Sequence, residues 1–293
     1  MKRISLVAML LGALALGAFG YEGSIVFQGG LGAKALGMGG AFAALADDGT
    51  VALWNPAGIL AFGENAWIGG STSQLFGMVP YQYVGGGFSF AGYGIGLGWA
   101  NAEAKTVEDD KVIVYSANAF MGTVAVKLGD FGWVGANLKY YMEKITKNYS
   151  GFGFDLGVII PVMPELSVAV VVKDLGATID GQTVTPVYVA GLAGKLLEGA
   201  LILGTDVELS STFTVKNLRA GLAFQLIENL GIRAGLVVPE FDFNKYYVTV
   251  GAGFALGGLS VDAAYVLMSE PGESLVLSAT FLFGELFAPA TPE

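Results

Sequence analysis

The sequence has no cysteine, no histidine and little charge. Without cysteine, the chain can form neither disulfides nor a thiol site, and no cysteine can carry a lipid. Without histidine, it lacks the usual general base of serine hydrolases and the commonest zinc ligand. Only 14% of residues are charged, whereas about a quarter are charged in ordinary soluble domains. We therefore expect no enzyme, no metal site and no cofactor.

Apolar residues and glycine make up most of the composition in place of charged residues. Hydrophobic residues make up 54% of the 293 residues, and 45 residues are glycine. Some of this apolar surface must face something other than water. The formal net charge is −10, so nucleic acid is a poor candidate partner.

The N-terminus has the layout of a signal peptide. Lys2 and Arg3 precede an apolar stretch over residues 4–19, and the small residues Ala18 and Gly20 indicate cleavage after residue 20. An uncleaved membrane anchor is the alternative, but the stretch is shorter than the ~20 residues that a spanning helix needs. Either interpretation predicts export from the cytoplasm.

A period of two, typical of β-strands, runs through the rest of the chain. Residues 65–102 carry no charge and could be read as transmembrane helices, but Tyr93, Ile95, Leu97 and Trp99 alternate with glycines. Glycine at every second position would destabilise a helix, whereas a strand places the glycines on one face. The pattern predicts strands at 65–74, 81–90, 92–100, 112–127, 131–145, 149–160, 165–173, 184–195, 199–209, 214–227, 230–238, 244–256, 258–268 and 273–284.

These strands predict an all-β fold, a transmembrane antiparallel up-and-down β-barrel of about 14 strands. Most match the ~9–11 residues that cross a bilayer, and an even count leaves both termini in the periplasm. Lipid offers no hydrogen bonds to a free sheet edge, so the sheet must close. A soluble sandwich or propeller is the alternative, but its outer face should be rich in Lys and Glu. Segment 112–127 changes its apolar face partway, which indicates a bulge.

Residues 32–58 differ from the strands and read GAKALGMGGAFAALADDGTVALWNPAG. Thr50 can cap a short helix, and Asn55 with Pro56 suits a tight turn. A phosphate-binding loop at 37–40 is the alternative, but the chain has no G-x-G-x-x-G or P-loop pattern.

This segment resembles the N-terminal hatch of the FadL-type outer-membrane transporters and of their shorter PorV-like relatives. The resemblance implies a luminal plug inside a barrel of fourteen strands. It divides the chain into a signal peptide (1–20), a hatch (21–63), a barrel (64–285) and a tail (286–293). The hatch or gate residues that it implies are Gly37, Met38, Gly39, Gly40, Asp47, Asp48, Trp54, Asn55, Pro56, Ala57 and Gly58.

The chain is short for a FadL-type protein. About 230 barrel residues shared by fourteen strands leave roughly sixteen for each strand and turn. Long extracellular loops do not fit, so a capture groove built from such loops is in doubt. The PorV-like branch therefore remains open.

Strand alternation assigns several charged residues to the inner face, because a basic residue in lipid near the midplane would cost several kcal/mol. They either line the lumen as paired or solvated groups or form a polar path. The carboxylates at 206 and 208 could suggest acid/base chemistry or calcium, but acidic residues are common in porin-like linings. The predicted lining is Lys139, Glu143, Asp155, Lys173, Asp206, Glu208, Arg219, Arg233 and Asp262.

Two functions follow from these expectations for an outer-membrane protein whose partner is lipid. The first is passive transport of a small hydrophobic ligand, such as a fatty acid, which shifts the hatch at residues 55–57 and leaves laterally or into the periplasm. The second is a PorV-like scaffold that binds proteins of a secretion machine. A general diffusion porin is third, because a hatch would obstruct it.

Overall fold

The computed structural model describes residues 30–108, 111–144, 147–269 and 272–284. The predicted signal peptide and C-terminal tail lie outside the described residues. The N-terminal segment forms helices α3 (Ala33–Gly37) and α4 (Val51–Trp54) and the 3-10 helix η1 (Pro56–Phe62). Among the described helices, none combines the length and apolar character needed to cross a membrane.

Strands follow this segment, with the short 3-10 helix η2 (Leu197–Gly199) between two of them. They are β1 (Ala66–Leu75), β2 (Val79–Phe90), β3 (Tyr93–Glu108), β4 (Lys111–Lys127), β5 (Trp133–Lys144), β6 (Asn148–Met163), β7 (Leu166–Ile179), β8 (Gln182–Thr183), β9 (Val187–Leu196), β10 (Leu201–Leu209), β11 (Val215–Ile227), β12 (Leu230–Pro239), β13 (Tyr247–Leu256), β14 (Leu259–Leu267) and β15 (Ser274–Leu282).

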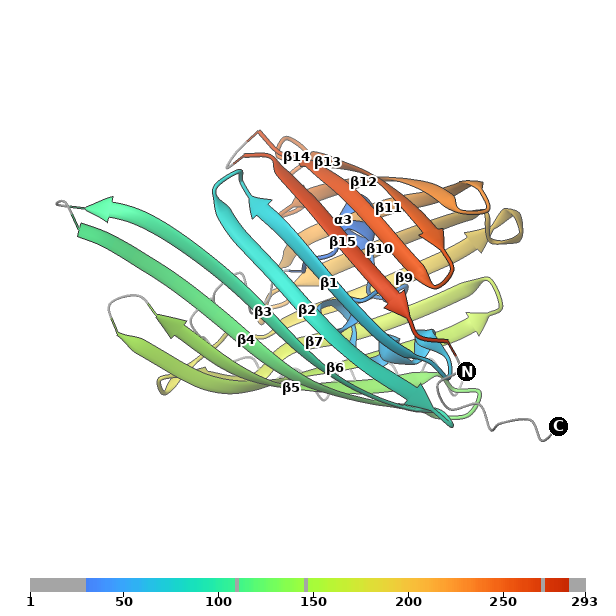
Figure 1. The fold of residues 1–293 in the computed structure, drawn as a ribbon, viewed down its shortest axis with the longest axis horizontal. Helices are drawn as coiled ribbons and strands as arrows, with labels where there is room; N and C mark the ends of the chain where they lie inside the picture. The colour runs from blue at the N-terminus through green and yellow to red at the C-terminus, as the bar shows by residue number, and fades with distance from the viewer. Residues whose placement is uncertain (1–29, 109–110, 145–146, 270–271, 285–293) are drawn as a thin grey trace.

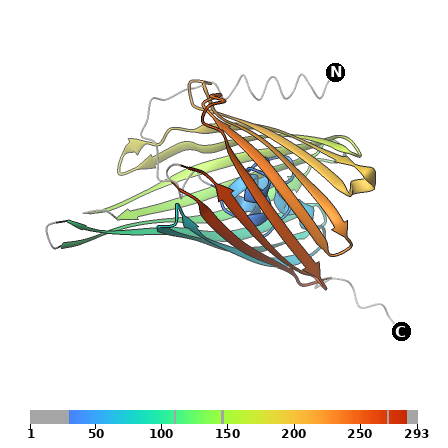
Figure 2. The ribbon, with the colours of Figure 1, turned by 90° about the horizontal axis from the view of Figure 1, so that it is seen from above.

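The strands form a closed antiparallel barrel with the N-terminal helices inside it (Figures 1 and 2). Apart from the short β8, each strand pairs with the strands before and after it, and β1 pairs with β15 to close the ring. Of the fifteen strands, β8 pairs only with β7, and β7 pairs directly with β9. The closed barrel therefore has fourteen strands, which confirms the predicted all-β barrel and its plug.

Every predicted strand overlaps an observed one, but the predicted bulge in 112–127 is wrong. β4 keeps an unbroken register with β3 over 111–126 and with β5 over 116–127. Before Ser116, β4 pairs only with β3, in a hairpin that extends past β2 and β5, so its apolar face need not stay constant there. The register shifts occur instead between β6 and β7.

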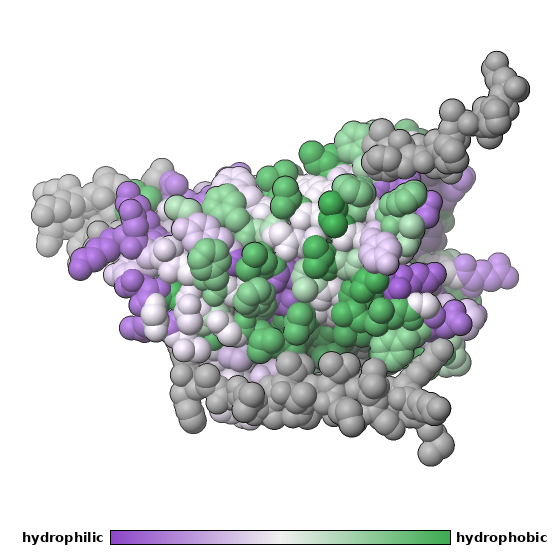
Figure 3. Space-filling view, turned by 90° about the horizontal axis from the view of Figure 1, so that it is seen from below, coloured by the Kyte–Doolittle hydropathy of each residue, from purple (hydrophilic) through white to green (hydrophobic). Residues whose placement is uncertain are grey.

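The alternating pattern separates an apolar exterior from a mixed interior. Ile95, Leu97, Phe152 and Phe154 are exposed on the outside, whereas the intervening Asp155 is buried. On the face in Figure 3, apolar side chains form a band between polar ends. This arrangement suits a bilayer, because lipid-facing and lumen-facing residues alternate along each spanning strand.

We expect the cost of a charge on the exterior to depend on its depth. Leu222 lies near the middle of β11 and Leu226 near its end, and both side chains are exposed. Leu222→Arg should lower the free energy of unfolding in lipid vesicles by about 2–4 kcal/mol, and Leu226→Arg by about 0–1 kcal/mol. Denaturant unfolding in vesicles measures both, and equal losses would contradict the membrane placement.

Candidate functional site: the hatch and its seat in the barrel

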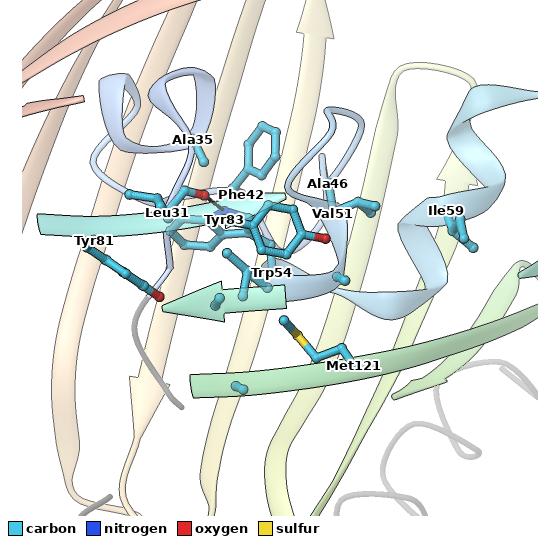
Figure 4. Packing of buried hydrophobic residues seen from close by; sticks show 14 of the residues in the cluster. Leu31, Ala35, Phe42, Ala46, Val51, Trp54, Ile59, Tyr81, Tyr83 and Met121 are labelled. Carbon is cyan, nitrogen blue, oxygen red and sulfur yellow. Dashed lines mark hydrogen bonds between the residues drawn. The ribbon is translucent and has the colours of Figure 1, made fainter. Parts of the chain in front are cut away.

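The described part of the hatch, residues 30–63, has a core built around Trp54. The Trp54 indole nitrogen donates to the Leu31 carbonyl at 2.9 Å, and its ring meets Phe42 edge to face at 5.9 Å. Figure 4 shows these residues in one cluster with Tyr81 and Tyr83 of β2. The hatch is therefore packed internally and against the barrel wall.

Asn55 and Pro56 shape the second half of the hatch. The Asn55 side chain is fully buried and accepts from the Ala57 nitrogen at 3.0 Å, which caps η1, while Pro56 occupies the first turn. The Asn55 amide also donates to the carbonyls of Ala43 at 2.8 Å and of Val158 on β6 at 3.4 Å. One side chain thus caps a helix, joins two parts of the hatch and contacts the wall.

Thr50 does not cap α4 through its side chain, contrary to the prediction. Its hydroxyl donates to the Asp48 carboxylate at 2.6 Å, and its backbone nitrogen donates to the same oxygen at 2.8 Å. The neighbouring Asp47 pairs with Lys34 at 2.8 Å. Because an acceptor two residues earlier takes the hydroxyl, Thr50 stabilises the turn before the helix instead.

Inward glycines of the wall allow the hatch backbone to come very close. A Cβ at Gly135 of β5 would overlap the backbone of Pro56 and Ala57, and one at Gly235 of β12 would overlap Gly39. Gly94 and Gly96 of β3 face Ile59, as expected for the inward glycines of this strand, whereas Gly98 faces Tyr83 of the wall. We call the wall glycines that contact the hatch the glycine seat: Gly69, Gly87, Gly94, Gly96, Gly135, Gly157, Gly191, Gly204, Gly221, Gly235 and Gly251.

Polar side chains of the wall hold the hatch backbone. Asp206 of β10 accepts from the nitrogens of Phe42 and Ala43, both at 2.9 Å. Thr249 of β13 accepts from the Gly39 nitrogen at 3.0 Å and donates to the Gly37 carbonyl at 3.1 Å. Further contacts to residues 33, 49, 52 and 59 come from Ser278, Thr280, Asn137 and Ser89.

The sequence reasoning missed these uncharged contacts. Thr249, Ser278, Thr280, Asn137 and Ser89 all occupy inward positions, but only charged residues were selected from that face. Their positions on the inward-facing side of the alternating strands were the signal that could have identified them. It could not show which inward residues would meet the hatch, because that depends on the path of the hatch through the lumen.

Lys139 is the centre of a buried ionic cluster. Its side chain lies 2.7 Å from Asp155 and 2.8 Å from Asp174, and Tyr141 donates to Asp174. Asn137 donates both to Asp155 at 2.9 Å and to the hatch carbonyl of residue 52 at 2.8 Å. The ionic cluster is therefore connected to the hatch through one amide.

Asp174 was not predicted, because strict alternation puts it on the outer face next to Lys173. β7 shifts register against β6 here, Asp174 has a φ of 59°, and both side chains are buried. Lys173 lies 5.5 Å from the Trp54 ring centroid. The bulge thus brings two consecutive residues inside.

The other predicted lining residues are also engaged. Glu208 pairs with Arg219 at 2.5 Å, and Arg233 pairs with Asp262 at 2.7 Å. Glu143 accepts from Tyr115 at 2.7 Å. Within the described ranges, no group of three or more acidic residues could hold a metal ion.

The predicted gate residues lie together in the lumen. Met38, Trp54, Ala57 and most others are buried, and Asp47 is the exposed member. Gly37 faces Gly251, Gly40 faces Trp54 and Arg219, and Gly58 packs against Ala46. They therefore lie inside the barrel, whereas their role as a hatch or gate stays a prediction.

Comparisons with solved structures show what this fold resembles. The CymD monoaromatic hydrocarbon channel superposes with a TM-score of 0.69 at 13% identity, over 87% of this chain and 97% of that chain. A Pseudomonas aeruginosa FadL homologue gives 0.64 at 11%, over 90% and 99%. The Ralstonia pickettii toluene transporter TbuX gives 0.61 at 12%, over 88% and 98%.

No protein-family model matches the chain, and no curated protein matches its sequence. At these identities the structural matches establish a shared fold. The chain therefore has the fold of FadL-type outer-membrane channels, as the hatch motif suggested, and the PorV-like branch stays a prediction.

Filling the glycine seat should displace the hatch. Gly135→Val places a branched side chain where the hatch backbone lies, and overpacking of this kind costs about 1–3 kcal/mol. We expect faster proteolysis of residues 30–63 while the barrel stays folded. Gly122→Val is the matched control, because a Cβ at Gly122 meets nothing within 4 Å. Equal cleavage of the two variants would contradict the seat.

Asp48 should make hatch docking depend on pH. Burial raises the pKa of this hatch carboxyl to about 6, although the hydrogen bonds from Thr50 oppose the shift. The ordinary value is about 3.9, so the docked hatch favours the protonated form. This stabilisation is complete below about pH 4 and is lost as the pH rises through about 6. Proteolysis from pH 4 to 7 should therefore accelerate in the wild type but less in Asp48→Asn, and parallel profiles would refute the assignment.

Proposed function

We propose that this chain is an outer-membrane channel that passes small hydrophobic compounds and is gated by its N-terminal hatch. The observation that carries the proposal is a hatch held in the lumen by exchangeable hydrogen bonds, inside a barrel with the fold of hydrocarbon channels. A general porin would need an open lumen. The apolar exterior and the export signal expected from the sequence support an outer-membrane location.

The hatch contacts favour displacement over a permanent closure. Its backbone is held mainly by neutral or singly charged side chains of the wall, such as Thr249, Ser278 and Asp206. Each such bond contributes about 0.5–1.5 kcal/mol net, or about 1.5–3 kcal/mol with a charged acceptor. A permeant that repacks part of the hatch can offset one or two of these bonds.

Compounds related to toluene are the first probes to use, because CymD is described as a monoaromatic hydrocarbon channel and TbuX as a toluene transporter. The lumen offers aromatic surfaces to such a compound, including Phe42 and Trp54 of the hatch and Tyr83 of β2. Fatty acids are the second probe. Both probes are apolar, and both would gain from the dispersion contacts of these rings.

Asp206→Ala should raise the uptake rate by several-fold, because two hatch amides lose their acceptor. The measurement is entry of labelled toluene or oleate into vesicles with a lipopolysaccharide outer leaflet. Thr205→Ala is the matched control, one residue away on the opposite face of β10. Deletion of 30–63 should admit both the probe and ions, because the lumen is then open.

Wild-type vesicles that take up the probe no faster than protein-free vesicles would reject the proposal. Equal uptake by the wild type and the hatch deletion would show that the hatch is no gate. Stable recovery of secretion proteins from solubilised membranes, together with no uptake, would support the PorV-like scaffold instead.

A further inference from the structure

The barrel exterior carries a depression of about 740 Å³ that the transport proposal does not use. It crosses the wall along one row of paired residues, in which large side chains alternate with glycine. Consecutive strands contribute Ile68, Gly86, Leu97, Gly122 and Leu138 to this row. Because glycine has no side chain, the wall is thin at these positions. The next outward-facing row, toward the end of the barrel where β3 ends, adds aromatic rings, including those of Phe120, Tyr140 and Phe152.

The depression is a groove and not an opening through the wall. Gly86 pairs with Ile68 and Leu97, and Gly122 pairs with Leu97 and Leu138, without a shift in register. The backbone hydrogen bonds beneath the groove are therefore intact. An occupant can approach only from the bilayer.

The bilayer must fill this groove with hydrocarbon. Water does not stabilise an apolar depression inside the hydrocarbon region of the bilayer. The volume of the groove lies within the ~300–1,000 Å³ of typical ligand sites. Leu97, 75% exposed, stands between two glycine gaps and gives the groove an uneven shape. A flexible acyl chain can adapt to that shape. A second barrel would instead bring its own row of aromatic side chains against this one and would leave the groove unfilled.

Polar groups mark where a lipid headgroup would begin. In the row above the aromatic rings, the Asn118 amide oxygen accepts from Asn101 at 3.1 Å and from Trp99 of the aromatic row at 3.0 Å. The next outward row pairs Ser116 with Glu103 and Lys144. The face thus changes from apolar rings to amides and then to charges.

The spacing fits one leaflet. Leu97 and Glu103 are six residues apart, or about 20 Å at ~3.3 Å per residue. On strands tilted by about 35–45°, this is about 15 Å along the membrane normal, or half of the ~30 Å hydrocarbon core. The charged row therefore lies near the headgroup level when the groove lies near the midplane.

We infer that this groove binds an acyl chain of lipid A, the phosphorylated glycolipid of the outer leaflet. Both termini of an even-stranded barrel lie in the periplasm, so the charged row faces the cell exterior. Lys144 and Lys147 are exposed there and can meet the phosphates of lipid A. The inference rests on the outer-membrane location in the proposed function and not on transport.

Gly122→Leu tests the inference by filling the groove without steric conflict. The full chain is purified from outer membranes, washed in mild detergent and mixed with hexa-acyl lipid A, and native mass spectrometry counts the bound lipid. We expect one lipid A on the wild type and about tenfold weaker binding by Gly122→Leu. Gly194→Leu is the matched control, because this glycine faces outward on β9 and its Cβ would meet only the Glu165 carbonyl, at 4.0 Å.

Lys144→Ala should also weaken binding, because it removes a phosphate partner. If Gly122→Leu fails to fold, Leu97→Ala removes the exposed side chain between the gaps and should weaken binding as well. Equal binding by the wild type and these variants would overturn the inference. So would a preference for phosphatidylethanolamine, or a lipid-free dimer that Gly122→Leu abolishes. Uptake of the hydrophobic probe is measured separately from lipid A binding. A protein that binds lipid A but shows no uptake would contradict the transport proposal and leave the lipid inference standing.

Discussion

The need to satisfy every backbone hydrogen bond in hydrocarbon governs this structure. A sheet in lipid cannot have a free edge, so β1 must pair with β15. A ring of fourteen strands is too wide for its own side chains to fill, unlike a ring of eight. The closed edge therefore creates a lumen, and the lumen creates the need for a plug.

The glycine content follows from the same constraint. A plug of short helices has many backbone amides and carbonyls of its own, and they must find partners inside the barrel. Glycines in the wall let the plug come close enough for inward side chains such as Asp206 and Thr249 to bond its backbone. On the exterior, Gly86 and Gly122 have a different consequence, because they hollow the surface that lipid contacts.

Alternation predicted most of the fold because each spanning strand has one face in lipid and one face inside. It failed where that condition ends. At Asp174, the register shift of β7 turns a residue inward that alternation places outside. Before Ser116 of β4, the β3–β4 hairpin extends past its neighbouring strands, so the change of face there reflects the end of the paired wall and not a bulge.

The hatch was recognised from its motif, but its contacts could not be predicted. The Asn55 side chain joins Ala43, η1 and β6, and only the folded path of the chain brings these three together. Likewise, Thr50 looked like a helix cap, yet the nearby Asp48 takes its hydroxyl. The local sequence indicates which atoms can form hydrogen bonds, whereas the path of the hatch inside the barrel determines which of them come into contact.

The distribution of the hatch contacts limits how the hatch can move. The contacts come from strands around the ring, including β2, β5, β10, β13 and β15. A neutral contact contributes about 0.5–1.5 kcal/mol and a contact to the Asp206 carboxylate about 1.5–3 kcal/mol. Losing all of them together would make a fully displaced hatch rare, because every 1.4 kcal/mol lowers its population tenfold. Losing one or two lowers the population by about tenfold to a hundredfold, which thermal motion still samples. Local rearrangement of one part, with the rest still seated, is therefore the movement that these contacts favour.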